Sequence, residues 1–149
     1  MDFLTELWQN RILVAALIAW AAAQLAKTVI YVILYRDWRA DRLWGSGGMP
    51  SSHAATVCAL TVSSLLKYGV GSPIFAITFV LTAVVLHDAR GVRLETGKQA
   101  KVIAAITAIL EKTYQGMIPD VELKELVGHT PLQVAVGSAM GVVVGIFVH

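Results

Sequence analysis

The chain has 149 residues, of which 56% are hydrophobic and only 15% are charged. A typical soluble domain has about 25% charged residues, so this composition excludes an ordinary soluble domain and indicates a membrane protein. The formal net charge of +2 does not suggest nucleic-acid binding, because the basic residues flank apolar segments where anionic headgroups lie, and the single cysteine, Cys58, excludes an intramolecular disulfide.

Four apolar segments predict transmembrane helices, because a helix needs about 20 mostly apolar residues to cross the hydrocarbon core. They are residues 12–35, 50–68, 73–89 and 131–148. The first is not a cleaved signal peptide, since no basic region precedes it and it contains Gln24 and Lys27. The second approaches spanning length only if residues 50–53 form its first turn, and a re-entrant or tilted helix is the alternative. The predicted fold is an all-α, polytopic membrane helix bundle.

The stretch from Gly91 to Thr130 combines charged residues with a short apolar run, Val102 to Leu110. This run is too short to span a bilayer, and lysines flank it. It therefore predicts an amphipathic or interfacial helix between the third and fourth spans. No internal repeat is present, so we expect residues 1–149 to form a single membrane domain.

The basic residues predict the orientation of the chain, because short cytoplasmic loops carry an excess of lysine and arginine. Nine basic residues lie in the loops of residues 36–49 and 90–130, against two on the opposite side. Both loops are therefore expected in the cytoplasm, with both termini outside. The second and fourth helices then begin at the same aqueous surface, where helix N-termini attract anions.

The segment Gly47–His53 precedes and opens the second helix, and it combines groups that suit an anion site. Paired glycines, Gly47 and Gly48, let the backbone approach a ligand closely, and Pro50 presets a helical first turn. Ser51 or Ser52 either caps the helix or donates to a phosphate oxygen, and His53 lies in the first turn. An ordinary loop and N-cap is the alternative.

A second candidate segment, Gly128–Pro131, precedes the fourth helix. Thr130 is the expected N-cap and Pro131 the first helical residue, and Gln133 is placed to complete a capping box. His129 then lies immediately outside a positively polarised helix end. The alternative is a purely structural histidine beside a cap.

Further charged residues reach the same surface. The third segment ends at Asp88, Arg90 and Arg93, whose guanidinium groups either grip phosphate oxygens or anchor the helix at headgroups. Lys27 lies about two turns inside the cytoplasmic end of the first helix, where a lysine is costly unless it snorkels or meets an anion.

The candidate groups on this face suit phosphoryl transfer without a required metal. They are two histidines, two helix N-termini and several cations. One imidazole would attack phosphorus and the other would protonate the leaving alkoxide.

Three segments, Ser46–His53, Asp88–Arg93 and Lys124–Pro131, carry a resemblance to a known family. Together they resemble the divergent bacterial and plastid branch of the type 2 phosphatidic acid phosphatase superfamily, which includes lipid phosphate phosphatases, bacterial acid phosphatases and vanadium haloperoxidases. The resemblance covers nearly the whole chain.

The resemblance implies roles for individual residues. It makes His129 the nucleophile that forms a phosphohistidine and His53 the general acid, with no metal or other cofactor. It implies that Lys27, Ser51 and the backbone near Ser52 bind phosphate, with Arg36 or Arg39 as the arginine partner of the lysine. Where the family pattern is incomplete, we expect Arg90 or Arg93, with Lys124, to supply the missing cation and Asp88 or Glu125 the missing carboxylate. Gln133, Gly47 and Gly48 are expected to support the site. The chain departs from the superfamily pattern at Leu123, where an arginine is usual, and at Gln133, where an aspartate is usual.

The expected function is therefore a phosphatase in the cell membrane that acts at the cytoplasmic face on a phosphorylated lipid or isoprenoid. One alternative is a catalytically impaired protein that binds lipid headgroups or assembles a partner. A metal site built from His53, His87, Asp88 and His129 is a weaker alternative, because these residues lack a compact ligand spacing.

The fourth apolar segment carries a stripe of small residues at Gly137, Gly141 and Gly145. Glycines four residues apart lie on one helix face and permit close helix approach. The stripe is compatible with packing inside one chain or between two, and we expect a homodimer as one use of it.

Overall fold

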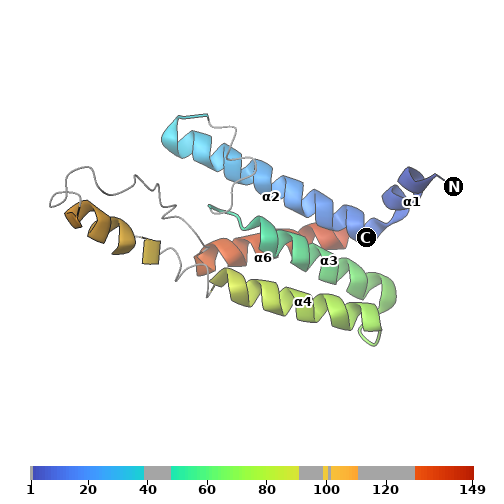
Figure 1. The fold of residues 1–149 in the computed structure, drawn as a ribbon. Helices are drawn as coiled ribbons and strands as arrows, with labels where there is room; N and C mark the ends of the chain where they lie inside the picture. The colour runs from blue at the N-terminus through green and yellow to red at the C-terminus, as the bar shows by residue number, and fades with distance from the viewer. Residues whose placement is uncertain (1, 39–47, 91–98, 101, 111–129) are drawn as a thin grey trace.

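The computed structural model describes residues 2–38, 48–90, 99–100, 102–110 and 130–149, with the backbone alone at residue 90. All secondary structure in these residues is helical, which confirms the predicted all-α class (Figure 1). A short α1 precedes the predicted segments, and residues 102–110 are helical as predicted. The helices are α1 (Phe3–Gln9), α2 (Arg11–Tyr35), α3 (Ser52–Tyr68), α4 (Pro73–Arg90) and α6 (Pro131–Val148).

Helix boundaries follow local sequence signals. Asn10 caps α2 through its side chain, which accepts from the backbone N–H of Leu13, and Arg36 ends α2 in the left-handed conformation at φ 52°. The predicted start of α3 is wrong by two residues, because Pro50 precedes the helix and does not form its first turn. The helix begins at Ser52, with Ser51 as its N-cap, because the serine side chain satisfies a backbone N–H that a proline cannot.

The helix α3 lies at the centre of the bundle and packs against α2, α4 and α6 (Figure 1). Its contact with α6 is the closest in the structure, because the backbone of α3 occupies the glycine stripe of α6. A methyl group added at Gly137 would overlap the Ser51 carbonyl oxygen, and one added at Gly141 would overlap that of Ala55. The stripe is therefore used within the chain. A homodimer, which stays a prediction, would need another surface.

The interior of the bundle contains small side chains, whereas large apolar side chains face outward. One buried cluster combines Ala19 and Ala23 of α2 with Ala55 and Ala59 of α3, and all four are fully buried. The outward side chains include Leu25, Val29 and Ile33 of α2, Ile77, Val80 and Val84 of α4, and Val143 and Phe147 of α6. Membrane bundles show this arrangement, because small residues let helices approach closely and lipid solvates the large apolar ones.

Polar groups of α3 are bonded to neighbouring helices. Thr61 donates to the carbonyl oxygen of Thr78 at 2.9 Å, and Thr82 donates to that of Val57 at 2.9 Å. Ser63 donates to the carbonyl oxygen of Gly145 at 3.3 Å. These bonds explain how the polar second segment is accommodated inside an apolar bundle, since hydroxyl groups in such an environment need partners.

Two described helices, α2 and α6, are long and apolar enough to cross a membrane. The apolar part of α4, Pro73–Ala89, is shorter, and α3 has 17 residues. The four predicted spans therefore stay a prediction. Residues 102–110 lie apart from the bundle in Figure 1 and expose Val102, Ile103, Ile106, Ile109 and Leu110. The interfacial location of this helix stays a prediction.

Candidate functional site

The N-termini of α3 and α6 meet at one end of the bundle, as the sequence predicts. The backbone N–H of Ser51 donates to the carbonyl oxygen of Gln133 at 3.0 Å, which ties the residue before α3 to the first turn of α6. A buried apolar cluster of Ala54, Ala89 and Val134 joins the start of α3, the end of α4 and the start of α6. Three helix ends thus share one surface of the molecule.

The two serines of the Pro50–His53 segment are buried and serve the backbone. Ser51 is fully buried, and its hydroxyl oxygen accepts from the backbone N–H of Ala54 at 3.3 Å. In the structure, Ser51 therefore has the first of its two predicted roles, the N-cap of α3. Ser52 is also buried, whereas His53, one residue further, is exposed. The imidazole is therefore the accessible group of this segment.

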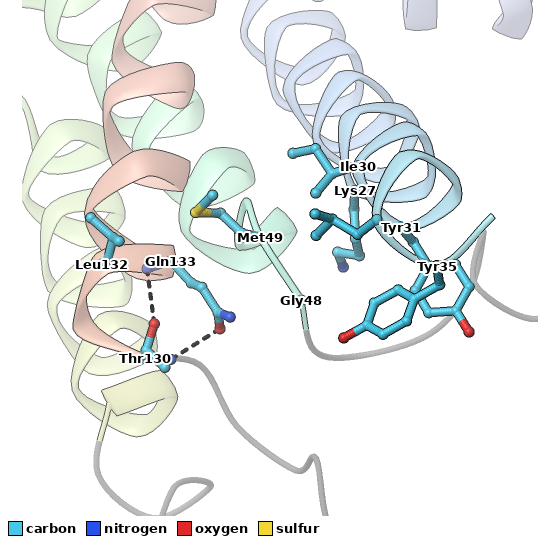
Figure 2. A pocket seen from close by; sticks show the side chains of 10 residues that line it. Lys27, Ile30, Tyr31, Tyr35, Gly48, Met49, Thr130, Leu132 and Gln133 are labelled. Atoms are coloured by element: carbon cyan, nitrogen blue, oxygen red, sulfur yellow. Dashed lines mark hydrogen bonds between the residues drawn. The ribbon is translucent and has the colours of Figure 1, made fainter. Parts of the chain in front are cut away.

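The start of α6 contains the predicted capping box. The backbone N–H of Gln133 donates to the Thr130 hydroxyl at 3.3 Å, and the backbone N–H of Thr130 donates to Gln133 Oε1 at 3.0 Å (Figure 2). Pro131 is the first helical residue. This reciprocal pair fixes the direction in which the chain enters α6. It also fixes the backbone that follows position 129.

Lys27 is buried within α2, with 5% of its surface exposed. Its ammonium group donates to Gln24 Oε1 at 2.7 Å. Gln24 lies one turn back along α2 and is also buried. Its Cγ lies 3.2 Å from where a Cβ on Gly48 would be, so the lysine stem packs against the glycine. The chain there has φ +83°, a conformation that favours glycine.

A pocket of about 280 Å³ lies between α2, the Gly48–Met49 segment and the start of α6 (Figure 2). Figure 2 shows Lys27, Tyr31 and Tyr35 on the α2 side and Gln133 and Thr130 on the α6 side. The remaining lining residues are Ile30, Leu34, Gly48, Met49 and Leu132. The pocket therefore combines a cation and polar groups with apolar side chains, which suits an amphipathic anionic ligand.

The structure brings some of the predicted site residues together. Lys27, Gly48 and Gln133 line the pocket, whereas Ser51 and Ser52 are buried beside it and His53 is exposed on α3. Asp88 is half-buried on α4. Outside the described residues lie His129, Arg39, Gly47, Arg93 and Lys124, and the side chain of Arg90. Within the described part of the chain, no three His, Cys, Asp or Glu side chains gather as metal ligands.

Sequence reasoning missed Tyr31 and Tyr35, and the apolar half of the pocket. A signal for the tyrosines was present, because residues 27, 31 and 35 are spaced by four and share one helix face. Their rings stack at a centroid distance of 4.7 Å. The apolar lining carries no such signal, since Leu132 and Met49 become neighbours of α2 only through the tertiary fold.

The small-residue interior and the apolar exterior indicate a helical membrane protein, and a pocket that contains Lys27 lies where the helix ends meet. The chain matches the model of the Divergent PAP2 family over residues 8–144, and it belongs to this family. It is 34% identical over 151 residues to "Uncharacterized membrane protein YuiD" of Bacillus subtilis (strain 168), covering 92% of each chain. No solved structure matches the chain.

Proposed function

We propose that the chain is a membrane-embedded phosphatase that hydrolyses a phosphorylated lipid or isoprenoid at the cytoplasmic face. The observation that carries the proposal is the buried Lys27 in a pocket between α2, Gly48 and the start of α6, in a member of the Divergent PAP2 family. A buried cation beside two helix N-termini favours a bound phosphate. The apolar lining of the same pocket favours a phosphate group that is attached to a lipid.

The proposed reaction has two steps. An imidazole nitrogen of His129 attacks phosphorus, the bond from phosphorus to the lipid oxygen breaks, and protonated His53 gives its proton to the departing alkoxide. Water then attacks the phosphohistidine, with His53 taking its proton, and releases inorganic phosphate. His129 precedes the cap residue Thr130, which lines the pocket, and His53 is exposed in the first turn of α3.

The remaining groups would stabilise the charge on phosphorus. Lys27 acts from α2 and Arg90 from the last residue of α4, while Arg93 and Lys124 act from the segments that follow α4 and precede α6, with Asp88 and Arg39 in support. We propose that α2, α3, α4 and α6 all span the membrane, with residues 36–49 and 90–130 cytoplasmic and both termini outside. Phosphatidic acid and phosphatidylglycerol phosphate are suitable test substrates.

A headgroup-binding protein without turnover is a second candidate, and one observation favours it. Gln133 stands where the wider superfamily has an aspartate, and its Oε1 accepts from the Thr130 backbone in the capping box. An amide in this position cannot stabilise an imidazolium as a carboxylate does. This candidate predicts headgroup binding that depends on Lys27 but no release of phosphate.

The test is an assay of purified protein against a panel of lipid phosphates, with and without a chelator. Wild type should release phosphate from at least one substrate, equally in both conditions, while His129→Ala and His53→Ala should lose at least about a hundredfold in kcat/KM. Release that survives both substitutions would exclude the histidine mechanism. Binding without release by wild type would favour the second candidate.

A further inference from the structure

We propose that Gln24 is a positioning residue that holds the Lys27 ammonium in the pocket lining, and so sets the affinity of the site for a phosphate group. This inference rests on the proposed function, because it assigns Lys27 to phosphate. Gln24 does not line the pocket, and it would act only through the lysine.

The hydrogen bond between the two side chains is short and buried. Gln24 has 7% of its surface exposed and Lys27 has 5%, and Oε1 accepts from Nζ at 2.7 Å. The two residues are three apart on α2 and therefore lie on the same face, one above the other. An ammonium group has three N–H donors, and a fixed bond from one of them fixes the directions of the others.

The lysine side chain is held at a second point by Gly48. The Cγ and Cδ atoms of Lys27 lie 3.2 and 3.5 Å from the position of a Cβ on Gly48, so the stem lies against the glycine backbone. A lysine has four rotatable side-chain bonds and would otherwise lose considerable entropy on binding a ligand. With its stem packed and its end bonded, Lys27 is preorganised, which is the condition for strong electrostatic stabilisation.

The chemistry of the amide matters as much as its position. An amide oxygen orients the ammonium without cancelling its charge, whereas a carboxylate at position 24 would neutralise it in a low-dielectric interior. Gln24 therefore suits a site in which Lys27 must remain cationic for an incoming phosphate. An acidic residue would suit a purely structural ion pair.

The test compares Gln24→Leu, which has similar volume but no acceptor, and Gln24→Glu, which keeps the acceptor but adds a charge. We expect both to lower kcat/KM by about tenfold or more, because a buried hydrogen bond to a charged group is lost or the ammonium is neutralised. The matched control is Thr28→Val, which removes a buried hydroxyl from the same helix; Thr28 donates to the Gln24 backbone carbonyl at 2.9 Å and does not line the pocket. It should leave kcat/KM unchanged.

A double-mutant cycle separates positioning from a structural role. If Gln24 acts through Lys27, Gln24→Leu should cost almost nothing when combined with Lys27→Met. Equal and additive losses in the two backgrounds, or a Gln24→Leu variant with wild-type kcat/KM, would overturn the inference. Thermal unfolding in detergent checks that each variant is folded.

Failure of the phosphatase proposal is distinguishable from failure of this inference. If wild type releases no phosphate, the same variants are tested for stabilisation by phosphatidic acid micelles, with micelles of zwitterionic phosphatidylcholine as the comparison. The inference predicts an increase in melting temperature with phosphatidic acid alone, lost in Gln24→Leu and Lys27→Met and kept in Thr28→Val. No such increase in wild type, or an increase that Gln24→Leu retains, would overturn it.

Discussion

The contact between α3 and α6 and the contact between α2 and α6 are built in opposite ways. The first brings backbone against backbone at Gly137 and Gly141, and at Gly145 the Val62 side chain and the Ala59 carbonyl oxygen lie against the glycine. In the second, Met140 and Val144 of α6 pack against the alanine cluster that α2 shares with α3, but α2 and α6 diverge toward the loop end (Figure 1). There the pocket lies between them, containing Lys27.

This difference separates a scaffold from the proposed binding surface. The pair α3 and α6 fixes the relative positions of two helix N-termini, and the bond from Ser51 N–H to the Gln133 carbonyl holds them together. The helix α2 contributes Lys27 to the pocket beside these N-termini. Changes in the glycine stripe should therefore alter folding, whereas changes on the pocket face of α2 should alter ligand affinity and leave the fold intact.

The largest expected effect is a loss of stability caused by substitutions in the glycine stripe of α6. A Cβ at Gly141 would overlap the backbone of Ala55, which cannot move without shifting α3. Gly141→Ala should destabilise the protein by about 1–3 kcal/mol, and Gly141→Leu should prevent folding. Thermal unfolding in detergent measures the first, and the yield of monodisperse protein measures the second.

The matched control for the stripe is Gly71→Ala, because a Cβ at Gly71 would meet nothing within 4 Å. Its melting temperature should equal that of wild type. Equal melting temperatures for Gly141→Ala and Gly71→Ala would show that the α3–α6 contact is looser than the structure has it.

The next largest effect is at Lys27, on the binding side of the comparison. Lys27→Met keeps most of the stem and removes the charge, so kcat/KM or headgroup affinity should fall by about a hundredfold. Stability should be unchanged or higher, since burying a charge in an apolar bundle is unfavourable. Lys67→Met is the control, because Lys67 is exposed at the far end of α3. A loss of stability with retained affinity would make Lys27 structural.

Much of this fold could be predicted from the sequence. Apolar segments bounded by prolines, glycines and charges gave helix ends within two residues of those observed, and Thr130 with Gln133 gave the capping box. These features depend on short stretches of chain. The sequence could not decide whether the glycine stripe packs within one chain or between two. Its partner is α3, which lies about eighty residues away in sequence.

The site was predictable only in part, for the same reason. Lys27 was identified because an isolated charge within an apolar segment is unusual, and the structure places it in the pocket. The capping role of Ser51, the packing of Gly48 on the lysine stem and the apolar wall at Leu132 all require the tertiary arrangement of α2, α3 and α6. No pattern in the sequence specifies these distances.

A smaller effect is expected at Gly48, where the scaffold meets the binding surface. Gly48 and Gly69 both have positive φ, +83° and +77°, so alanine at either position introduces backbone strain of about 1 kcal/mol or more. Only Gly48→Ala would also press on the Lys27 stem. We expect a loss of stability in both variants and a severalfold loss of kcat/KM in Gly48→Ala alone. Equal activity in the two variants would mean that the stem moves aside without consequence.

The smallest effect should come from the cap of α6. Thr130→Ala removes the hydroxyl that accepts from Gln133 N–H, and Asn10→Ala removes the equivalent cap of α2 at the opposite end of the bundle. Each should cost about 1 kcal/mol of stability. Only the first loosens the chain beside His129 and the pocket, so kcat/KM should fall by about threefold in Thr130→Ala and stay constant in Asn10→Ala. A similar fall in both variants would assign the loss to general destabilisation, and the cap would then have no part in placing His129, the proposed nucleophile.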